Sequence, residues 1–190
     1  MNNEQYLVVV SGPSGAGKDT VVQELLRRHP EIEVSISATT RAMRPGEQQG
    51  VNYYYKTVAE FEEDIAQGRI LEYTNYCGNY YGTPRSEVDR RIQNGTTVVL
   101  VIETVGAANI KRMYPGATTV FICPPSMEQL EQRLRGRGTE TEEVIRCRLD
   151  QAAREMELAE HYDMRVVNDT VEDCAEKLYQ AISTHQQSAR

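Results

Sequence analysis

The sequence lacks any hydrophobic run long enough to cross a membrane. Its longest apolar stretches, such as residues 98–102, have five residues, whereas a membrane-spanning helix needs about 20. Residues 1–5 also lack the basic segment with which a secretory signal begins. We therefore expect a cytoplasmic protein without a membrane partner.

The sequence has few cysteines and fewer basic than acidic residues. The four cysteines, at positions 77, 123, 147 and 174, form no C-x-x-C pair, so we interpret them as reduced thiols outside any zinc site or disulfide framework. Lys and Arg number 21 against 28 Asp and Glu, which gives a net charge of -7. Such a chain is not expected to bind nucleic acid through its overall charge, and any basic site must be local.

The sequence does contain alternating strand-like and helix-like segments over 190 residues, about the length of one domain. Mostly unbroken apolar runs predict strands at residues 6–11, 34–37, 97–102, 118–122 and 164–167. Helical patterns predict helices at residues 18–29, 58–67, 85–94, 107–114, 127–135, 142–161 and 171–183. Strands that are apolar on both faces are typical of a parallel sheet covered by helices, so we predict an α/β fold.

Two segments differ from this regular pattern. In the helix predicted at 142–161, apolar residues recur on one packing face: Ile145, Leu149, Ala152, Met156 and Ala159. Thr139, before this helix, and Glu142, its first residue, have the spacing of a capping box. Residues 41–82 fit the alternation poorly because they are rich in Gly and Tyr with one short helical pattern, so we interpret them as an inserted lobe.

A glycine-rich loop joins the first predicted strand to the first predicted helix. It matches G-x-x-x-x-G-K through Gly12, Pro13, Ser14, Gly15, Ala16, Gly17 and Lys18. In this setting backbone N–H groups and the helix N-terminus face phosphate oxygens, and the lysine reaches the β- and γ-phosphates. The loop predicts a nucleoside triphosphate site, and the alternative is an ordinary glycine-rich turn.

The position after the lysine departs from the motif. Asp19 stands where Ser or Thr usually offers a hydroxyl to Mg²⁺, and Thr20 follows it. Asp19 could bind Mg²⁺ directly or through water, Thr20 could supply the hydroxyl, or phosphate oxygens and waters could provide most ligands. We favour a water-mediated contact from Asp19.

Arginines and tyrosines after the second predicted strand suggest a second anion site. Arg41 and Arg44 are three residues apart, so their forked guanidinium groups can converge on one phosphate. Seven of the eleven tyrosines fall between Tyr53 and Tyr81, and phenolic hydroxyls also donate to phosphate. The alternatives are solvated arginines and tyrosines that pack the lobe.

Two glutamates are candidates for recognising a base. A buried carboxylate at Glu72 or Glu103 accepts hydrogen bonds from guanine N1–H and the 2-amino group, whereas adenine has an acceptor at N1 and no 2-amino group. Such a carboxylate selects guanine. The alternative for each glutamate is a solvated or capping acid.

Four motifs, in order, make the chain resemble the guanylate kinases, which are ATP:GMP phosphotransferases: residues 12–18, 37–44, 78–83 and 137–142. The resemblance extends from about residue 6 to residue 182. It implies a P-loop NTPase-type core (residues 1–36, 89–134 and 154–190), a GMP-binding lobe (37–88) and a mobile lid (about 135–153). It also implies ATP and GMP as substrates and Mg²⁺ as cofactor.

The resemblance further implies roles for single residues. The GMP phosphate would be held by Arg41, Arg44, Tyr53 and Tyr81, and the guanine would be read by Ser37, Glu72 and Thr83. Glu103, where the family commonly has Asp, would reach the purine amino group, although Val101 and Val105 beside it replace commonly polar residues. On the donor side, Lys18, Arg137 and Arg148 would meet the transferring phosphoryl group, Arg133 would bind ATP from the lid, and Asn168 would contact adenine.

Two other functions remain as alternatives. One is another nucleoside monophosphate kinase, although the Asp-Gly-Phe-Pro-Arg segment of adenylate kinases is missing. The other is a catalytically inactive guanylate kinase-like module that binds protein partners, although the loop and Lys18 are intact. A regulatory GTPase is disfavoured because its Asn-Lys-x-Asp motif for guanine is missing. The sequence leaves both a monomer and a homodimer open.

Overall fold

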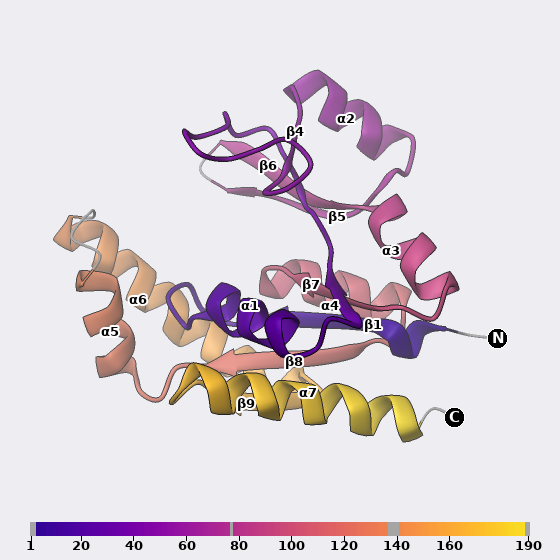
Figure 1. Cartoon of the computed structure of the whole chain (residues 1–190). Helices are drawn as coiled ribbons and strands as arrows, with labels where there is room; N and C mark the ends of the chain where they lie inside the picture. Colours follow the sequence, from indigo (N-terminus) through magenta and orange to yellow (C-terminus); the bar gives the residue numbers. More distant parts are fainter. Residues whose placement is uncertain (1–2, 77, 137–140, 189–190) are drawn as a thin grey trace.

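The computed structural model describes residues 3–76, 78–136 and 141–188. Its core is a five-stranded parallel sheet, ordered β2 (Ile32–Val34), β7 (Thr97–Val101), β1 (Leu7–Ser11), β8 (Thr118–Cys123) and β9 (Met164–Val167). Helices cover the sheet, and a smaller lobe stands apart from it at the top of Figure 1. The structure confirms the predicted α/β fold with a parallel sheet.

The helices follow the predicted order. They are α1 (Lys18–Arg28), α2 (Val58–Ala66), α3 (Arg85–Gln93), α4 (Thr104–Met113), α5 (Met127–Arg135), α6 (Glu142–Glu157) and α7 (Val171–Ser188), with short 3₁₀ helices η1 (Glu4–Tyr6) and η2 (Leu158–His161). None of the helices in the described ranges has the length and apolar character needed to span a membrane. The three described cysteines, at 123, 147 and 174, are free, as predicted, and Cys77 lies outside the described residues.

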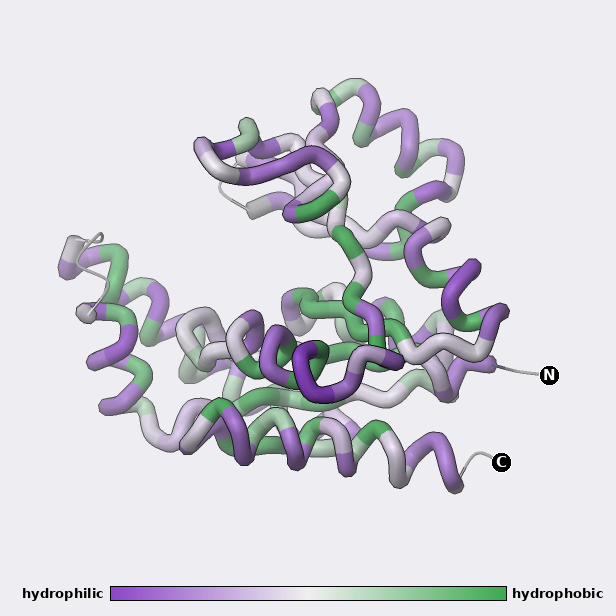
Figure 2. Tube along the Cα trace, in the orientation of Figure 1, coloured by the Kyte–Doolittle hydropathy of each residue, from purple (hydrophilic) through white to green (hydrophobic). Residues whose placement is uncertain are grey.

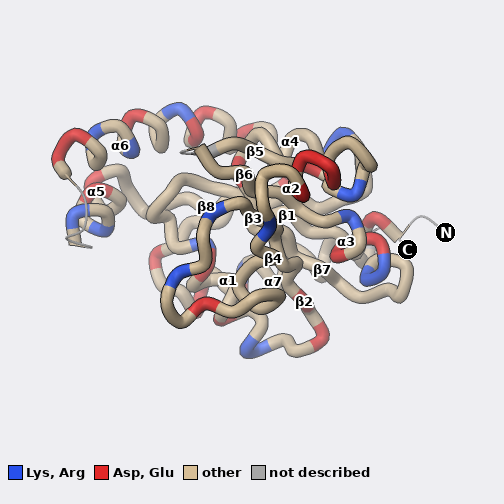
Figure 3. Tube along the Cα trace, turned by 90° about the horizontal axis from the view of Figure 1, so that it is seen from above, with Lys and Arg blue, Asp and Glu red and all other residues tan. Residues whose placement is uncertain are grey.

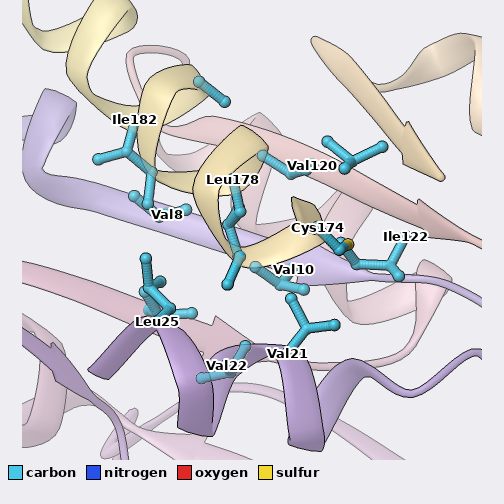
Figure 4. Close-up of a cluster of buried hydrophobic side chains, with 14 of the residues drawn as sticks. Val8, Val10, Val21, Val22, Leu25, Val120, Ile122, Cys174, Leu178 and Ile182 are labelled. Atoms are coloured by element: carbon cyan, nitrogen blue, oxygen red, sulfur yellow. The ribbon is translucent and has the colours of Figure 1, made fainter. Parts of the chain in front are cut away.

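The two faces of the central strand β1 build two halves of the hydrophobic core. Val8 and Val10 contribute to the half covered by α1 and α7, whereas Leu7 and Val9 contribute to the half covered by α3 and α4. All four are fully buried, because successive side chains of a strand point to opposite faces and both faces are covered. Figure 4 shows the first half, in which side chains of α1 and α7 meet those of β1 and β8.

The lobe contains a second sheet that the sequence analysis did not predict. Its strands are ordered β4 (Tyr54–Tyr55), β3 (Ala38–Thr39), β6 (Asn79–Pro84) and β5 (Ile70–Tyr76). Phe61 of α2 stacks on Tyr80 with 5.2 Å between ring centroids, so Tyr80 packs the lobe. Much of the lobe is hydrophilic, in contrast to the central sheet (Figure 2). Its strands were missed because they lack the continuous apolar runs of the core strands.

Several predicted boundaries are wrong. The strand predicted at 34–37 is observed at Ile32–Val34, because the chain then leaves the central sheet for the lobe, where β3 begins at Ala38. The helix predicted from residue 107 begins at Thr104, and residues 158–161 form a 3₁₀ turn rather than continuing α6. The last helix extends to residue 188 rather than 183.

The start of α6 also differs from the prediction in detail. Its N-cap is Thr141, whose hydroxyl accepts from the N–H of Val144, and not Thr139, which lies outside the described residues. The predicted packing face is confirmed, since its residues fall in two hydrophobic clusters: Ile145, Leu149 and Ala152 pack with α5, and Met156 and Ala159 pack with β8.

Candidate active site

The loop between β1 and α1 has a backbone that favours glycine. Gly12 has a φ of 143° and Gly17 a φ of 90°, where residues with a side chain are strained. A Cβ at Gly12 would stand 2.3 Å from the carbonyl oxygen of Ile122, and one at Gly17 would stand 2.5 Å from the side-chain nitrogen of Asn168. Both conformation and space therefore exclude larger residues from these two positions.

Lys18 is the first residue of α1, and its ammonium group lies against the loop. Nζ donates to the carbonyl oxygens of Gly12 at 2.5 Å and Pro13 at 3.1 Å. Asp19 and Thr20 follow in the first helical turn, and both are exposed. The loop thus combines a lysine with the positive end of a helix dipole, which is an anion-binding arrangement.

Arg133 and Asn168 brace the backbone of the loop. Asn168 is 3% exposed and donates from Nδ2 to the Ala16 carbonyl at 2.7 Å. Arg133 donates to the same carbonyl at 3.4 Å and to the Asn168 carbonyl at 3.1 Å. The sequence analysis did not anticipate this bracing, and the predicted contacts of both residues with ATP stay predictions.

A cavity of about 270 Å³ lies between the lobe and the carboxyl end of β7. The sequence-predicted residues that line it are Ser37, Tyr53, Glu72, Tyr81 and Glu103. Thr74, Gly82 and Ile102, which the sequence analysis did not select, line it too. Ligands of open α/β sheets bind outside the carboxyl ends of the strands, which is where this cavity lies.

Glu72 is the buried carboxylate of this cavity. It is 6% exposed, and its Oε1 accepts a hydrogen bond from the hydroxyl of Thr83 at 2.6 Å. The two residues face each other across the antiparallel strands β5 and β6. Burial raises the pKa of Glu72, the bond from Thr83 lowers it, and the nearby Glu103 carboxylate raises it again.

Arg41 is oriented by Glu47, a residue that the sequence analysis missed. Its Nη2 donates to Glu47 Oε1 at 2.8 Å, and its guanidinium group lies 5.4 Å from the ring centroid of Tyr53. Glu47 also accepts from the backbone N–H of Arg44 at 2.8 Å and from the Tyr55 hydroxyl at 2.7 Å. The bond from Arg41 is the main reason that the pKa of Glu47 is lowered to about 2. An acid three residues after Arg44 was the available sequence signal.

Glu87 joins the lobe to the core at the point where the chain enters the lobe. This buried carboxylate accepts from the Ile36 N–H at 3.1 Å, from the Tyr54 hydroxyl at 3.0 Å and from Arg91 at 2.9 Å. No local pattern marks Glu87 in the sequence, because Ile36 lies 51 residues away.

Burial is the main reason that the pKa of the Tyr53 hydroxyl is raised, and the charges of Tyr81 and then of Asp19, at the start of α1, raise it further.

Comparisons with known proteins agree with this architecture. The model of the family "Guanylate kinase" matches residues 4–185. A guanylate kinase of Desulfitobacterium hafniense is 50% identical over 93% of this chain and 88% of its own length. One of Synechocystis sp. is 49% identical over 93% of this chain and 92% of its own. The chain belongs to the guanylate kinase family. A crystal structure of guanylate kinase from Anaplasma phagocytophilum, at 34% identity, has a TM-score of 0.78 and covers 95% of this chain and 85% of that chain.

In this member of the guanylate kinase family, the predicted lid region comprises the end of α5 and most of α6. Arg135 bonds to Glu131 on its own helix at 2.8 Å and to Glu142 on α6. Arg148 lies on α6 and is half-buried, whereas Arg137 lies outside the described residues. Acidic and basic residues follow each other along α6 (Figure 3).

Proposed function

We propose that this chain transfers the γ-phosphoryl group of ATP to GMP, with the β1–α1 loop as donor site and the 270 Å³ cavity as acceptor site. Membership of the guanylate kinase family supports the reaction, which gives ADP and GDP. The observation that carries the residue assignment is the Glu72 carboxylate, 6% exposed, in the wall of this cavity.

Glu72 reads the guanine. Thr83 takes one hydrogen-bonding position on Oε1, and a carboxylate has further lone pairs with which to accept from N1–H and the 2-amino group. Adenine would set its N1 lone pair against this oxygen, leaving a buried carboxylate unpaired, which is costly. Ser37 lines the cavity for the base as well, and Glu103 lies at its edge for the purine amino group.

Arg41, Arg44, Tyr53 and Tyr81 hold the GMP phosphate. Glu47 and the rings of Tyr53 and Tyr55 fix the Arg41 guanidinium, so less conformational entropy is lost when phosphate binds. Tyr81 packs edge-on against Tyr53, with 6.1 Å between ring centroids, so both phenols belong to one wall.

The donor loop binds the ATP phosphates through the segment from Gly12 to Thr20. Its backbone N–H groups and Lys18 Nζ donate to the phosphate oxygens. To reach them, Lys18 gives up its hydrogen bonds to the carbonyl oxygens of Gly12 and Pro13. Arg133 and Asn168 keep the Ala16 peptide in place and lie beside the adenine and phosphate positions.

Transfer is achieved by placement and charge neutralisation, because phosphoryl transfer needs little covalent participation from the protein. Lys18, Arg41, Arg137 and Arg148 surround the moving group, and closure of the lid excludes water that would hydrolyse ATP. No general base is needed, since the phosphate of GMP is already an anion.

The residues at the start of α1 fit Mg²⁺. The Asp19 carboxylate and the Thr20 hydroxyl are exposed oxygen donors beside Lys18, the ligand type that Mg²⁺ takes. The arrangement we favour is a water-mediated contact from Asp19 to an ion that is also bound by the ATP phosphates. Bound Mg²⁺ would neutralise charge on the β- and γ-phosphates.

The remaining proposals rest on the sequence and the resemblance. They are the division into a core, a GMP lobe at 37–88 and a lid at about 135–153, a cytoplasmic location, and no nucleic-acid or membrane partner. The oligomeric state, monomer or homodimer, stays open. The intact loop disfavours an inactive protein-binding module.

A coupled assay of ADP formation tests the proposed function. The purified chain is incubated with ATP, Mg²⁺ and one acceptor at a time: GMP, AMP, UMP or TMP. We expect turnover with GMP to exceed that with any other acceptor by at least about 10³. Preference for another monophosphate would contradict the guanine assignment, and no turnover with any acceptor would favour the inactive module.

A further inference from the structure

The presence of glycine at position 106 is not explained by the mechanism. Gly106 is buried in the first turn of α4, and its φ lies outside the left-handed region. Glycine destabilises a helix relative to alanine, because it loses more conformational freedom on folding. The backbone therefore does not require glycine here, and the reason must lie in the space around its Cα.

The carboxylate of Glu72 occupies that space. A Cβ at position 106 would stand 2.4 Å from Glu72 Oε2, 3.1 Å from Glu72 Cδ and 3.4 Å from Cδ1 of Ile102. A non-bonded carbon and oxygen do not approach to 2.4 Å, so any side chain at 106 has to displace the carboxylate. The contact joins the lobe, through β5, to the first turn of a core helix.

The carboxylate cannot move freely. Its other oxygen, Oε1, accepts from Thr83 at 2.6 Å, and the residue is 6% exposed. A rotation that takes Oε2 away from position 106 therefore disturbs the Thr83 bond or moves the carboxylate farther into the cavity. The missing side chain at 106 thus sets where the carboxylate stands.

We propose that Gly106 is a positioning residue for guanine selection, acting by leaving the space that the Glu72 carboxylate needs. The proposal rests on the proposed function, in which Glu72 reads guanine. It goes beyond it by assigning specificity to a core helix position that acts through Glu72.

Gly82 provides a contrast within the same site. A Cβ there would stand 2.6 Å from the backbone carbonyl oxygen of Glu72 and 3.0 Å from Cζ of Phe61. A methyl group at 82 therefore pushes on backbone and on a packed ring, whereas one at 106 meets the end of the Glu72 side chain, which can shift toward the cavity without moving the backbone. We expect Gly82→Ala to weaken the fold and Gly106→Ala to spare it.

The test is the Gly106→Ala variant of the full chain, assayed with GMP and with IMP, which keeps N1–H but lacks the 2-amino group. We expect kcat/KM for GMP to fall about tenfold or more and the preference for GMP over IMP to shrink, because the displaced carboxylate no longer pairs with both donors. KM for ATP should not change, and the melting temperature should stay or rise.

The matched control is Ala108→Gly, an exposed position on the same helix. It should lower the melting temperature and leave GMP kinetics unchanged. In a Glu72→Ala background, assayed at high enzyme concentration, Gly106→Ala should change kcat/KM by less than about twofold, since no carboxylate remains to be displaced.

The outcomes separate this proposal from the proposed function. If Glu72→Ala keeps GMP turnover within about threefold of the parent, the guanine reader itself is wrong. If Glu72→Ala is severely impaired but Gly106→Ala keeps the parent's GMP preference, only the role of Gly106 is wrong. A Gly106→Ala variant that melts lower than Ala108→Gly, or that slows GMP equally in both backgrounds, would also overturn it.

Discussion

The β1–α1 loop and the lobe, which we propose as the donor and acceptor sites, are built in opposite ways. The loop uses backbone N–H groups of consecutive residues in a conformation fixed by Gly12 and Gly17. The lobe presents side chains that are each held by a partner: Glu47 holds Arg41 in the segment after β3, and Thr83 of β6 holds Glu72 of β5. A backbone site recognises phosphate of any nucleotide, whereas a side-chain site can also distinguish one base from another.

The two regions also differ in what supports them. The loop lies against β8, with the Ile122 carbonyl beside Gly12, and Asn168 braces it from the end of β9. The lobe has a small core of its own, around Phe61, and its entry is tied to the core domain by polar contacts of Glu87. An added methyl group should therefore damage the loop through its backbone, while changes of the Glu72 and Arg41 side chains in the lobe should act through specificity.

The largest expected effect tests the lobe. Glu72→Ala should lower GMP turnover by about 10⁴, because the donors of guanine lose their buried acceptor. ATP binding should be unchanged, since the loop does not depend on Glu72. Steady-state kinetics measure GMP turnover, and calorimetric titration measures ATP affinity. A parallel loss of GMP turnover and ATP affinity would mean that the two sites are not separate.

The second-largest effect is expected for arginines of the proposed lid. Arg148→Ala, and likewise Arg137→Ala outside the described residues, should lower kcat by about 10² or more, because an arginine that meets transition-state charge contributes 10³ to 10⁵. Affinity for GMP alone should change little. Calorimetric titration of GMP into each variant checks this, and a large loss of GMP affinity with normal kcat would move the arginine to the acceptor site.

Gly17→Ala tests the loop. The residue has a φ of 90°, and a Cβ would press on Asn168, so we expect a loss of stability of about 1–3 kcal/mol and about tenfold weaker ATP binding. GMP affinity should persist. Chemical denaturation and titration with each nucleotide provide the measurements. Normal ATP affinity in a destabilised variant would show that the loop tolerates the change.

A smaller effect is expected at Asp19. Asp19→Asn should raise severalfold the Mg²⁺ concentration needed for half-maximal activity, because a neutral amide replaces an anionic contact near the ion. GMP affinity should be unaffected. If the Mg²⁺ titration of the variant overlays that of the parent, Asp19 is only a charge at a helix end. The same titration of Thr20→Val would then show whether the Thr20 hydroxyl binds the ion or phosphate oxygens and waters provide most of its ligands.

The smallest effect concerns pH. The folded-state pKa of Glu72 is raised, mainly by burial, so its contribution to stability is full below its unfolded pKa and is lost as pH rises through the folded pKa. Glu72→Gln, which stays neutral, should therefore gain in melting temperature over the parent as pH rises above about 4.5, the ordinary pKa of a glutamate. Melting temperatures of both proteins, measured over a series of pH values, test this prediction. A difference between the two melting temperatures that narrows with rising pH would contradict it.

Prediction from the sequence was accurate where the signals were local. The α/β order, the packing face of α6 and the loop with Lys18 follow from periodicity and from neighbouring residues, and the structure has all three. The predicted boundaries at Val34 and Thr104 were wrong, since after β2 the chain leaves the central sheet for the lobe and α4 begins before the segment whose periodicity marked it. The cap of α6 was placed two residues early.

The sequence by itself determined the helices, the strands of the central sheet and the conformation of the β1–α1 loop, because glycine conformation and apolar periodicity act within a few residues. Only the tertiary structure decided how the loop and the acceptor cavity are supported. Glu87 meets Ile36 across 51 residues, Asn168 meets Ala16 across 152, and Glu72 lies where a side chain at Gly106 would have to be. Such contacts depend on which strands and helices the fold brings together, and no local pattern carries that information.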